Sequence, residues 1–186
     1  MKVLALDSAS RVCGYAVLTG LAPADLVDAG LLKASTAKRV TADCPGWLQT
    51  HLRRPELQAV HRCLSLADDA IALVEEHAPT RIVCEIPSGK AGKGSKAQTS
   101  GGALATLGLA GGMVYQAIRG RWPQLTAPVT ERQWAHSGLG GGRGSKSRGQ
   151  ADVAALYGFV GYDPARDPGA DVADAIALAR WWIQRE

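Results

Sequence analysis

The sequence predicts an α/β domain with a five-stranded mixed sheet flanked by helices. Two observations lead to this class. Short apolar runs joined by short links open the chain, and later apolar runs alternate with segments of helical period. No internal repeat or linker divides the 186 residues, so we expect a single domain over residues 1–186.

Five apolar runs predict the strands, over residues 3–6, 13–19, 26–33, 81–86 and 126–130. The links between the first three are short, and Gly14 and Gly20 lie at or near them. An antiparallel meander is the simplest arrangement for these three strands.

Apolar residues at steps of three and four from Leu57 to Val74 predict an amphipathic helix over residues 55–76, and Pro79 stops it. Further helices are expected over residues 104–118, 150–157 and 170–182. The Ala- and Gly-rich segment 104–118 is a candidate dimer surface, and plain packing on the sheet explains it equally well. Residues 88–102 and 137–149 are read as glycine-rich loops.

The net charge of +4 mildly favours a polyanionic partner. The four cysteines, Cys13, Cys44, Cys63 and Cys84, lack the spacing of a zinc knuckle or a redox pair. The N-terminus is charged too early for a signal peptide, and no charge-free stretch reaches the length of a membrane span. We therefore expect a cytoplasmic protein with no membrane partner.

Four acids stand where a site is expected. Asp7 and Glu85 each follow a buried apolar run, and Asp171 and Asp174 share one face of the start of the last helix. Carboxylates gathered in one cleft require a cation, and hard oxygen ligands select Mg²⁺ or Mn²⁺. Two such ions can activate a water and stabilise the leaving oxygen of a phosphodiester.

Each acid also has a purely structural interpretation. Asp171 lies where a helix favours a capping aspartate, Asp7 can open an Asx turn, and Glu85 can be a buried acid paired with an arginine. Spacing alone leaves the catalytic interpretation the weaker one.

At these residues the chain resembles the RuvC family of Holliday-junction resolvases, within the ribonuclease-H-like superfamily. Three blocks carry the resemblance: residues 3–17 (VLALDSASRVCGYAV), residues 82–85 (IVCE) and residues 171–179 (DVADAIALA). The chain has Ser8-Ala9 where the family usually has Pro-Gly. It has Pro87-Ser88 where bacterial members carry a base-stacking aromatic, which indicates a divergent branch, of phage type as one guess.

The resemblance implies a ribonuclease-H-like fold and a homodimer that nicks four-way DNA junctions symmetrically. It implies two Mg²⁺ or Mn²⁺ ions on the four acids, and Lys146 in contact with the scissile phosphate or its neighbour. Six cations of the two glycine-rich loops are expected to bind the DNA backbone: Lys90, Lys93, Lys96, Arg143, Lys146 and Arg148. Solvated, flexible loops are the alternative for these cations.

Three other functions remain open. A nuclease of the same fold can act on other branched or RNA-containing nucleic acid. A non-catalytic protein can bind branched DNA by its structure. A sugar-kinase- or actin-like nucleotide binder also places a phosphate loop after a strand acid, but the chain has room for only one such domain and lacks a second phosphate loop.

Overall fold

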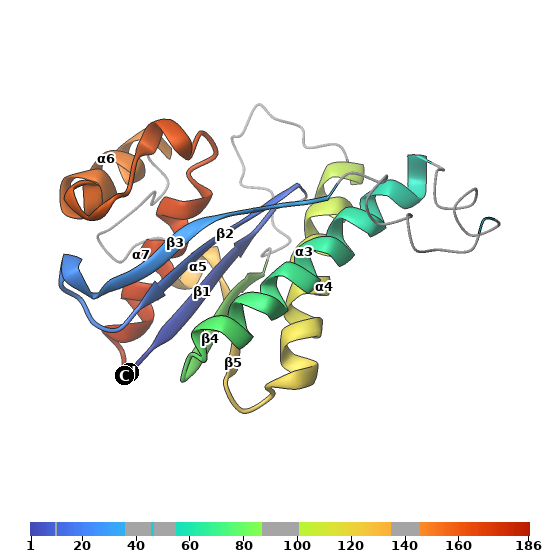
Figure 1. The fold of residues 1–186 in the computed structure, drawn as a ribbon. Helices are drawn as coiled ribbons and strands as arrows, with labels where there is room; N and C mark the ends of the chain where they lie inside the picture. Colours follow the sequence, from blue (N-terminus) through green and yellow to red (C-terminus); the bar gives the residue numbers. More distant parts are fainter. Residues whose placement is uncertain (10, 36–45, 47–54, 87–100, 135–145) are drawn as a thin grey trace.

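The structure is a computed structural model that describes residues 1–9, 11–35, 46, 55–86, 101–134 and 146–186 (Figure 1). The strands are β1 (Val3–Ser8), β2 (Val12–Leu18), β3 (Leu26–Lys33), β4 (Arg81–Ile86) and β5 (Thr126–Thr130). The α-helices are α3 (Pro55–His77), α4 (Gly101–Arg121), α5 (Glu131–Trp134), α6 (Lys146–Tyr157) and α7 (Asp171–Ile183). Three short 3₁₀ helices are η1 (Pro23–Asp25), η2 (Gly158–Val160) and η3 (Pro164–Arg166).

The five strands form one mixed sheet in the order β3-β2-β1-β4-β5. The first three form the expected antiparallel meander, and β4 and β5 pair in parallel with β1 and β4 respectively. In this topology, the end of β1, the start of β2, the end of β3 and the end of β4 all lie at the same end of the sheet. We call it the site end, marked by Ser8, Val12, Lys33 and Ile86.

Helices cover both faces of the sheet, with α6 and α7 on one side and α3 and α4 on the other (Figure 1). Side chains of a strand point alternately to the two faces. In β1, Val3 and Ala5 join the core under α7, whereas Leu4 and Leu6 join the core under α3 and α4. The helix α7 is rich in buried alanines, and these small side chains let it lie close to the sheet.

The predicted elements are largely confirmed. The strands β3, β4 and β5 have the predicted bounds, and the helix expected over residues 55–76 ends one residue later. The prediction for the loop over residues 137–149 was wrong at its end, because α6 begins at Lys146 instead of residue 150. The glycine-rich composition of residues 137–149 suggested a loop, but Gly149 is buried inside this helix.

The helix α4 packs on the sheet through Ala110, Val114 and Ile118, which are fully buried. Packing on the sheet, one of the two explanations for the Ala- and Gly-rich segment, therefore applies to the buried side of α4. Across the ranges that the structure describes, none of the helices combines the length and the apolar character needed to cross a membrane.

Candidate active site

The four predicted acids come from three elements that meet at the site end. Asp7 follows Leu6, and Leu6 pairs with Cys84, so Asp7 and Glu85 occupy neighbouring strands about 4.8 Å apart. Alternation places both side chains on the face that α7 covers, because Ala5 and Val83, two residues before them, lie in the core under α7. Asp171 and Asp174 form the first turn of that helix.

Gly14 of β2 lets the start of α7 come close to Asp7. It pairs directly with Asp7 across the β1–β2 ladder. A Cβ atom at this position would overlap with the backbone carbonyl of Asp171, so only glycine accommodates the helix at this distance. The contact fixes the first residue of α7 over the strand beside Asp7.

Trp134 binds one of the acids. Its indole Nε1–H donates a hydrogen bond of 2.8 Å to Oε2 of the half-buried Glu85, 49 residues away in the chain. The ring is 3% exposed and belongs to the core under α7. The sequence analysis did not single out Trp134, and no local motif predicts this contact.

Asp167 caps the helix that carries two of the acids. Its carboxylate accepts hydrogen bonds from the backbone N–H groups of Val172 (3.2 Å) and Ala173 (3.0 Å), and from the hydroxyl of Tyr162 (3.0 Å). The residue is 1% exposed. The side-chain cap of α7 is therefore Asp167, whereas Asp171 is the first residue of the helix itself.

Tyr162 remains a hydrogen-bond donor to Asp167 at neutral pH. Burial, followed by the charge of Asp167, raises the pKa of its phenol well above the ordinary value. The cap is thus a neutral hydroxyl and two backbone amides around one carboxylate, a set that holds α7 in place. A sequence signal existed in the Asp-Pro-Gly at residues 167–169, just before the helix.

Replacing Asp167 by asparagine should lower the free energy of unfolding by about 1–3 kcal/mol, because an amide N–H₂ then faces backbone N–H groups. Chemical denaturation measures this loss. Asp163→Asn is the control, since that side chain is half-exposed and makes one helix cap and an exposed ion pair. Equal losses from the two variants would contradict a special role for the buried acid.

Replacing Trp134 by phenylalanine should reduce the activity of the site by about 10–100-fold, as loss of a group that orients a metal-binding side chain does. Trp181→Phe is a matched control, because Trp181 is also buried on the α7 face but its ring lies against Trp182 and Arg185. Both variants lose ring volume. A similar loss of activity in both would assign Trp134 to packing alone.

A buried thiol, Cys13, lies beside Ser8 at the site end. Burial raises its pKa to about 12, and the charges of Asp7 and Asp171 add to the shift. Its side chain belongs to the core under α3 and α4, on the other face of the sheet from the one that α7 covers.

The donor set fits a hard divalent cation. Carboxylate oxygens from Asp7, Glu85, Asp171 and Asp174 are the ligands that Mg²⁺ and Mn²⁺ prefer, and such ions would supply water activation and charge stabilisation at a phosphodiester. Within the described ranges, no three His, Cys, Asp or Glu side chains are gathered closely enough to hold an ion as they stand. Glu85 is turned to Trp134, and the Asp171 carboxylate lies against Gly169.

The predicted basic residues are placed only in part. Lys90, Lys93, Lys96 and Arg143 lie outside the described residues, as does the side chain of Lys146. Lys146 is the first residue of α6, and Arg148 is exposed two residues later. Their contacts with DNA remain predictions.

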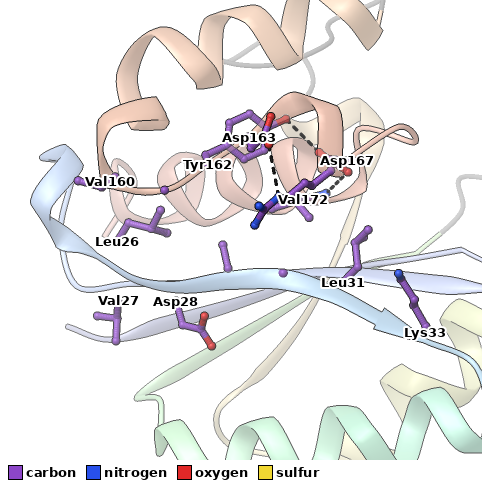
Figure 2. A pocket seen from close by; sticks show the side chains of 14 residues that line it. Leu26, Val27, Asp28, Leu31, Lys33, Val160, Tyr162, Asp163, Asp167 and Val172 are labelled. Atoms are coloured by element: carbon purple, nitrogen blue, oxygen red, sulfur yellow. Dashed lines mark hydrogen bonds and ion pairs between the residues drawn. The ribbon is translucent and has the colours of Figure 1, made fainter.

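A cavity of about 440 Å³ adjoins the site on the β3 side (Figure 2). Its floor is β3, and its opposite wall is the segment 160–167 with Val172 of α7. Leu26 lies toward one end of it, near Val160, and Leu31 lies toward the other, near Asp167 (Figure 2). None of the four acids lines it, so this cavity is a neighbour of the site and not the site itself.

The fold is ribonuclease-H-like, as solved structures of this architecture show. The chain superposes on Thermus thermophilus RuvC in complex with Holliday junction substrate with a TM-score of 0.64 and 17% identity, covering 97% of this chain and 92% of that one. It superposes on a second Thermus thermophilus RuvC structure with a TM-score of 0.58 and 16% identity, at the same coverage. No protein-family model and no curated protein matches the sequence. At these identities the likeness establishes the fold.

Proposed function

We propose that the protein is a metal-dependent endonuclease that cleaves DNA at four-way junctions. The proposal is supported by the placement of Asp7 and Glu85 on neighbouring strands under α7, the helix whose first turn carries Asp171 and Asp174, in a fold like that of RuvC. The Thermus thermophilus structure that the chain resembles is a complex with a Holliday junction substrate. Branched DNA is therefore the substrate we assign to this chain.

In this proposal the four acids hold Mg²⁺ or Mn²⁺, as two ions. Trp134 orients Glu85, and Asp167 holds α7 so that Asp171 and Asp174 face the sheet acids. Lys146 contacts the scissile phosphate or its neighbour. Arg148 and the cations Lys90, Lys93, Lys96 and Arg143 bind the flanking backbone.

The enzyme acts as a homodimer in this proposal, so that two sites nick a junction symmetrically. The helix α4 is the candidate surface for the contact. Its buried side chains face the sheet, whereas Leu109 is 36% exposed. Sedimentation of the pure protein measures the oligomeric state directly, and a monomer bound to the junction would contradict symmetric nicking by paired sites.

The deciding experiment is a cleavage assay with Mg²⁺ or Mn²⁺ on three substrates: a synthetic four-way junction, a flap and an RNA–DNA hybrid. We expect symmetric nicks in the junction, no cleavage without a divalent ion, and no cleavage by Asp174→Asn. Equal rates on the three substrates would overturn junction specificity and favour the broader nuclease. Tight junction binding without nicking would instead identify a structure-selective DNA-binding protein.

A further inference from the structure

The residue directly before the helix acids has an unusual backbone conformation. Ala170 is the N-cap of α7, with φ of 63° and ψ of 14°, in the left-handed region. An N-cap residue ordinarily has extended backbone angles. Among the non-glycine residues that the structure describes, only Ala78 and Ala170 have positive φ. A Cβ atom makes this conformation costly, so the surrounding structure must hold Ala170 in it.

The fold holds Ala170 through its backbone and its methyl group. Its N–H donates a 3.0 Å hydrogen bond to the carbonyl of Asp167, and its carbonyl accepts a 2.8 Å hydrogen bond from the N–H of Asp174. Its side chain is 1% exposed and belongs to the core under α7. A change of φ to negative values would move the methyl group out of this core and the carbonyl away from Asp174.

The neighbouring residue, Gly169, is a glycine for a different reason. Glycine adopts left-handed angles at the least cost, but the φ of Gly169 is not positive. A Cβ atom on Gly169 would instead overlap with Oδ2 of Asp171. The chain therefore has glycine where the carboxylate of Asp171 needs space, and alanine at position 170, where the backbone angles favour glycine.

Alanine at position 170 restricts the start of α7 more than glycine would. For a residue with a Cβ atom the left-handed region is a small basin, whereas glycine populates positive φ widely. The angles of Ala170 set the direction in which the chain enters α7, whose first turn carries Asp171 and Asp174. A small basin at this position therefore narrows the range of positions that both carboxylates can take.

We infer that Ala170 is a positioning residue, whose strained conformation fixes Asp171 and Asp174 and thereby raises the affinity of the four acids for a divalent ion. The inference rests on the proposed function, because it takes these acids as ligands of Mg²⁺ or Mn²⁺. Ala170 itself contacts neither the ion nor the DNA. Strained backbone that the surrounding structure maintains is common where a site must be preorganised.

The test uses three variants of the whole protein. Ala170→Gly relieves the strain and widens the backbone basin beside the acids. Ala78→Gly makes the same change at the other positive φ, between α3 and β4, at the opposite end of the sheet from the site end. Val172→Ala removes buried side chain from the first turn of α7 but leaves its backbone helical. Thermal melting establishes that all three are folded.

Two measurements are made without DNA. Hydrogen exchange follows the amides of Val172, Ala173 and Asp174, which the turn before α7 holds by hydrogen bonds. Titration with Mn²⁺, followed by electron paramagnetic resonance, gives the affinity of the site for the ion. Ala170→Gly should speed exchange at these amides and weaken Mn²⁺ binding about tenfold, as loss of a group that orients a metal ligand does. The other two variants should bind Mn²⁺ like the wild type.

Three results would overturn the inference. One is wild-type exchange in Ala170→Gly, because the alanine then does not restrict the turn. Another is faster exchange with wild-type Mn²⁺ affinity, which would leave Ala170 a structural role alone. The third is an equal loss of Mn²⁺ affinity in Ala78→Gly or Val172→Ala, since general strain relief or lost packing would then explain the effect.

The two proposals fail in different ways. If the wild type binds Mn²⁺ but cleaves none of the three substrates, the proposed nuclease activity is wrong, and the Mn²⁺ affinities still decide the role of Ala170. If the wild type binds no Mn²⁺, the ion site and the positioning role are both overturned. If the wild type cleaves junctions and Ala170→Gly binds Mn²⁺ equally tightly, only the positioning role is wrong.

Discussion

Replacing Asp7 by asparagine is expected to reduce DNA cleavage by at least about a hundredfold, as the loss of one preorganised charge at a reacting phosphate does. The amide keeps the shape of the side chain but is a poor ligand for a hard cation. The same result is expected for Glu85→Gln, Asp171→Asn and Asp174→Asn. Single-turnover cleavage of a labelled four-way junction measures the effect.

Junction binding should survive these substitutions, because removing a negative charge beside a phosphate does not weaken its attraction to the protein. The control is Asp163→Asn, an acid on the far wall of the neighbouring cavity that lies outside the predicted site. Full activity in any of the four variants would remove that acid from the mechanism. Reduced binding together with reduced cleavage would indicate a folding defect instead.

The elements that the sequence predicted best are those with a strong local pattern. The bounds of β3 and β5 follow from apolar runs between residues that end strands, and α3 follows from its apolar steps of three and four. The start of α6 was missed because Gly149 has the local appearance of a turn residue. Gly149 is buried inside the helix, and burial is a property of the folded chain that no local pattern contains.

The same distinction applies to the site. Asp7 and Glu85 follow buried runs, and their common face follows from alternation, so the sequence contains both facts. Trp134 was not singled out, because its hydrogen bond to Glu85 spans 49 residues and no local pattern contains it. Asp167 was overlooked because it lies four residues before α7. Its carboxylate reaches the N–H groups of Val172 and Ala173 only when the intervening Pro-Gly turn has folded.

Replacing Gly14 by alanine is expected to damage both stability and activity. The added Cβ would overlap with the backbone carbonyl of Asp171, which cannot rotate away as a side chain can. The start of α7 must then move off β2. Overpacking of this kind costs about 1–3 kcal/mol of unfolding free energy. Chemical denaturation of the variant and the wild type measures the loss.

The effect on cleavage should exceed the effect on folding. The displaced turn carries Asp171 and Asp174, and a shift of about 1 Å in a reacting group can reduce a rate about a hundredfold. The matched control is Gly112→Ala in α4, where the added Cβ meets nothing within 4 Å. Because alanine favours a helix more than glycine does, this substitution should leave the free energy of unfolding unchanged or raise it.

Gly14→Ala therefore separates two explanations of the close approach between β2 and α7. If the approach positions the acids, activity measured on the folded fraction falls much further in Gly14→Ala than in Gly112→Ala. If it serves packing alone, the folded fraction of Gly14→Ala cleaves at the wild-type rate. Gly14 also pairs with Asp7, so a displaced α7 alters the spacing between the helix acids and the strand acids at the residue where the two sets meet.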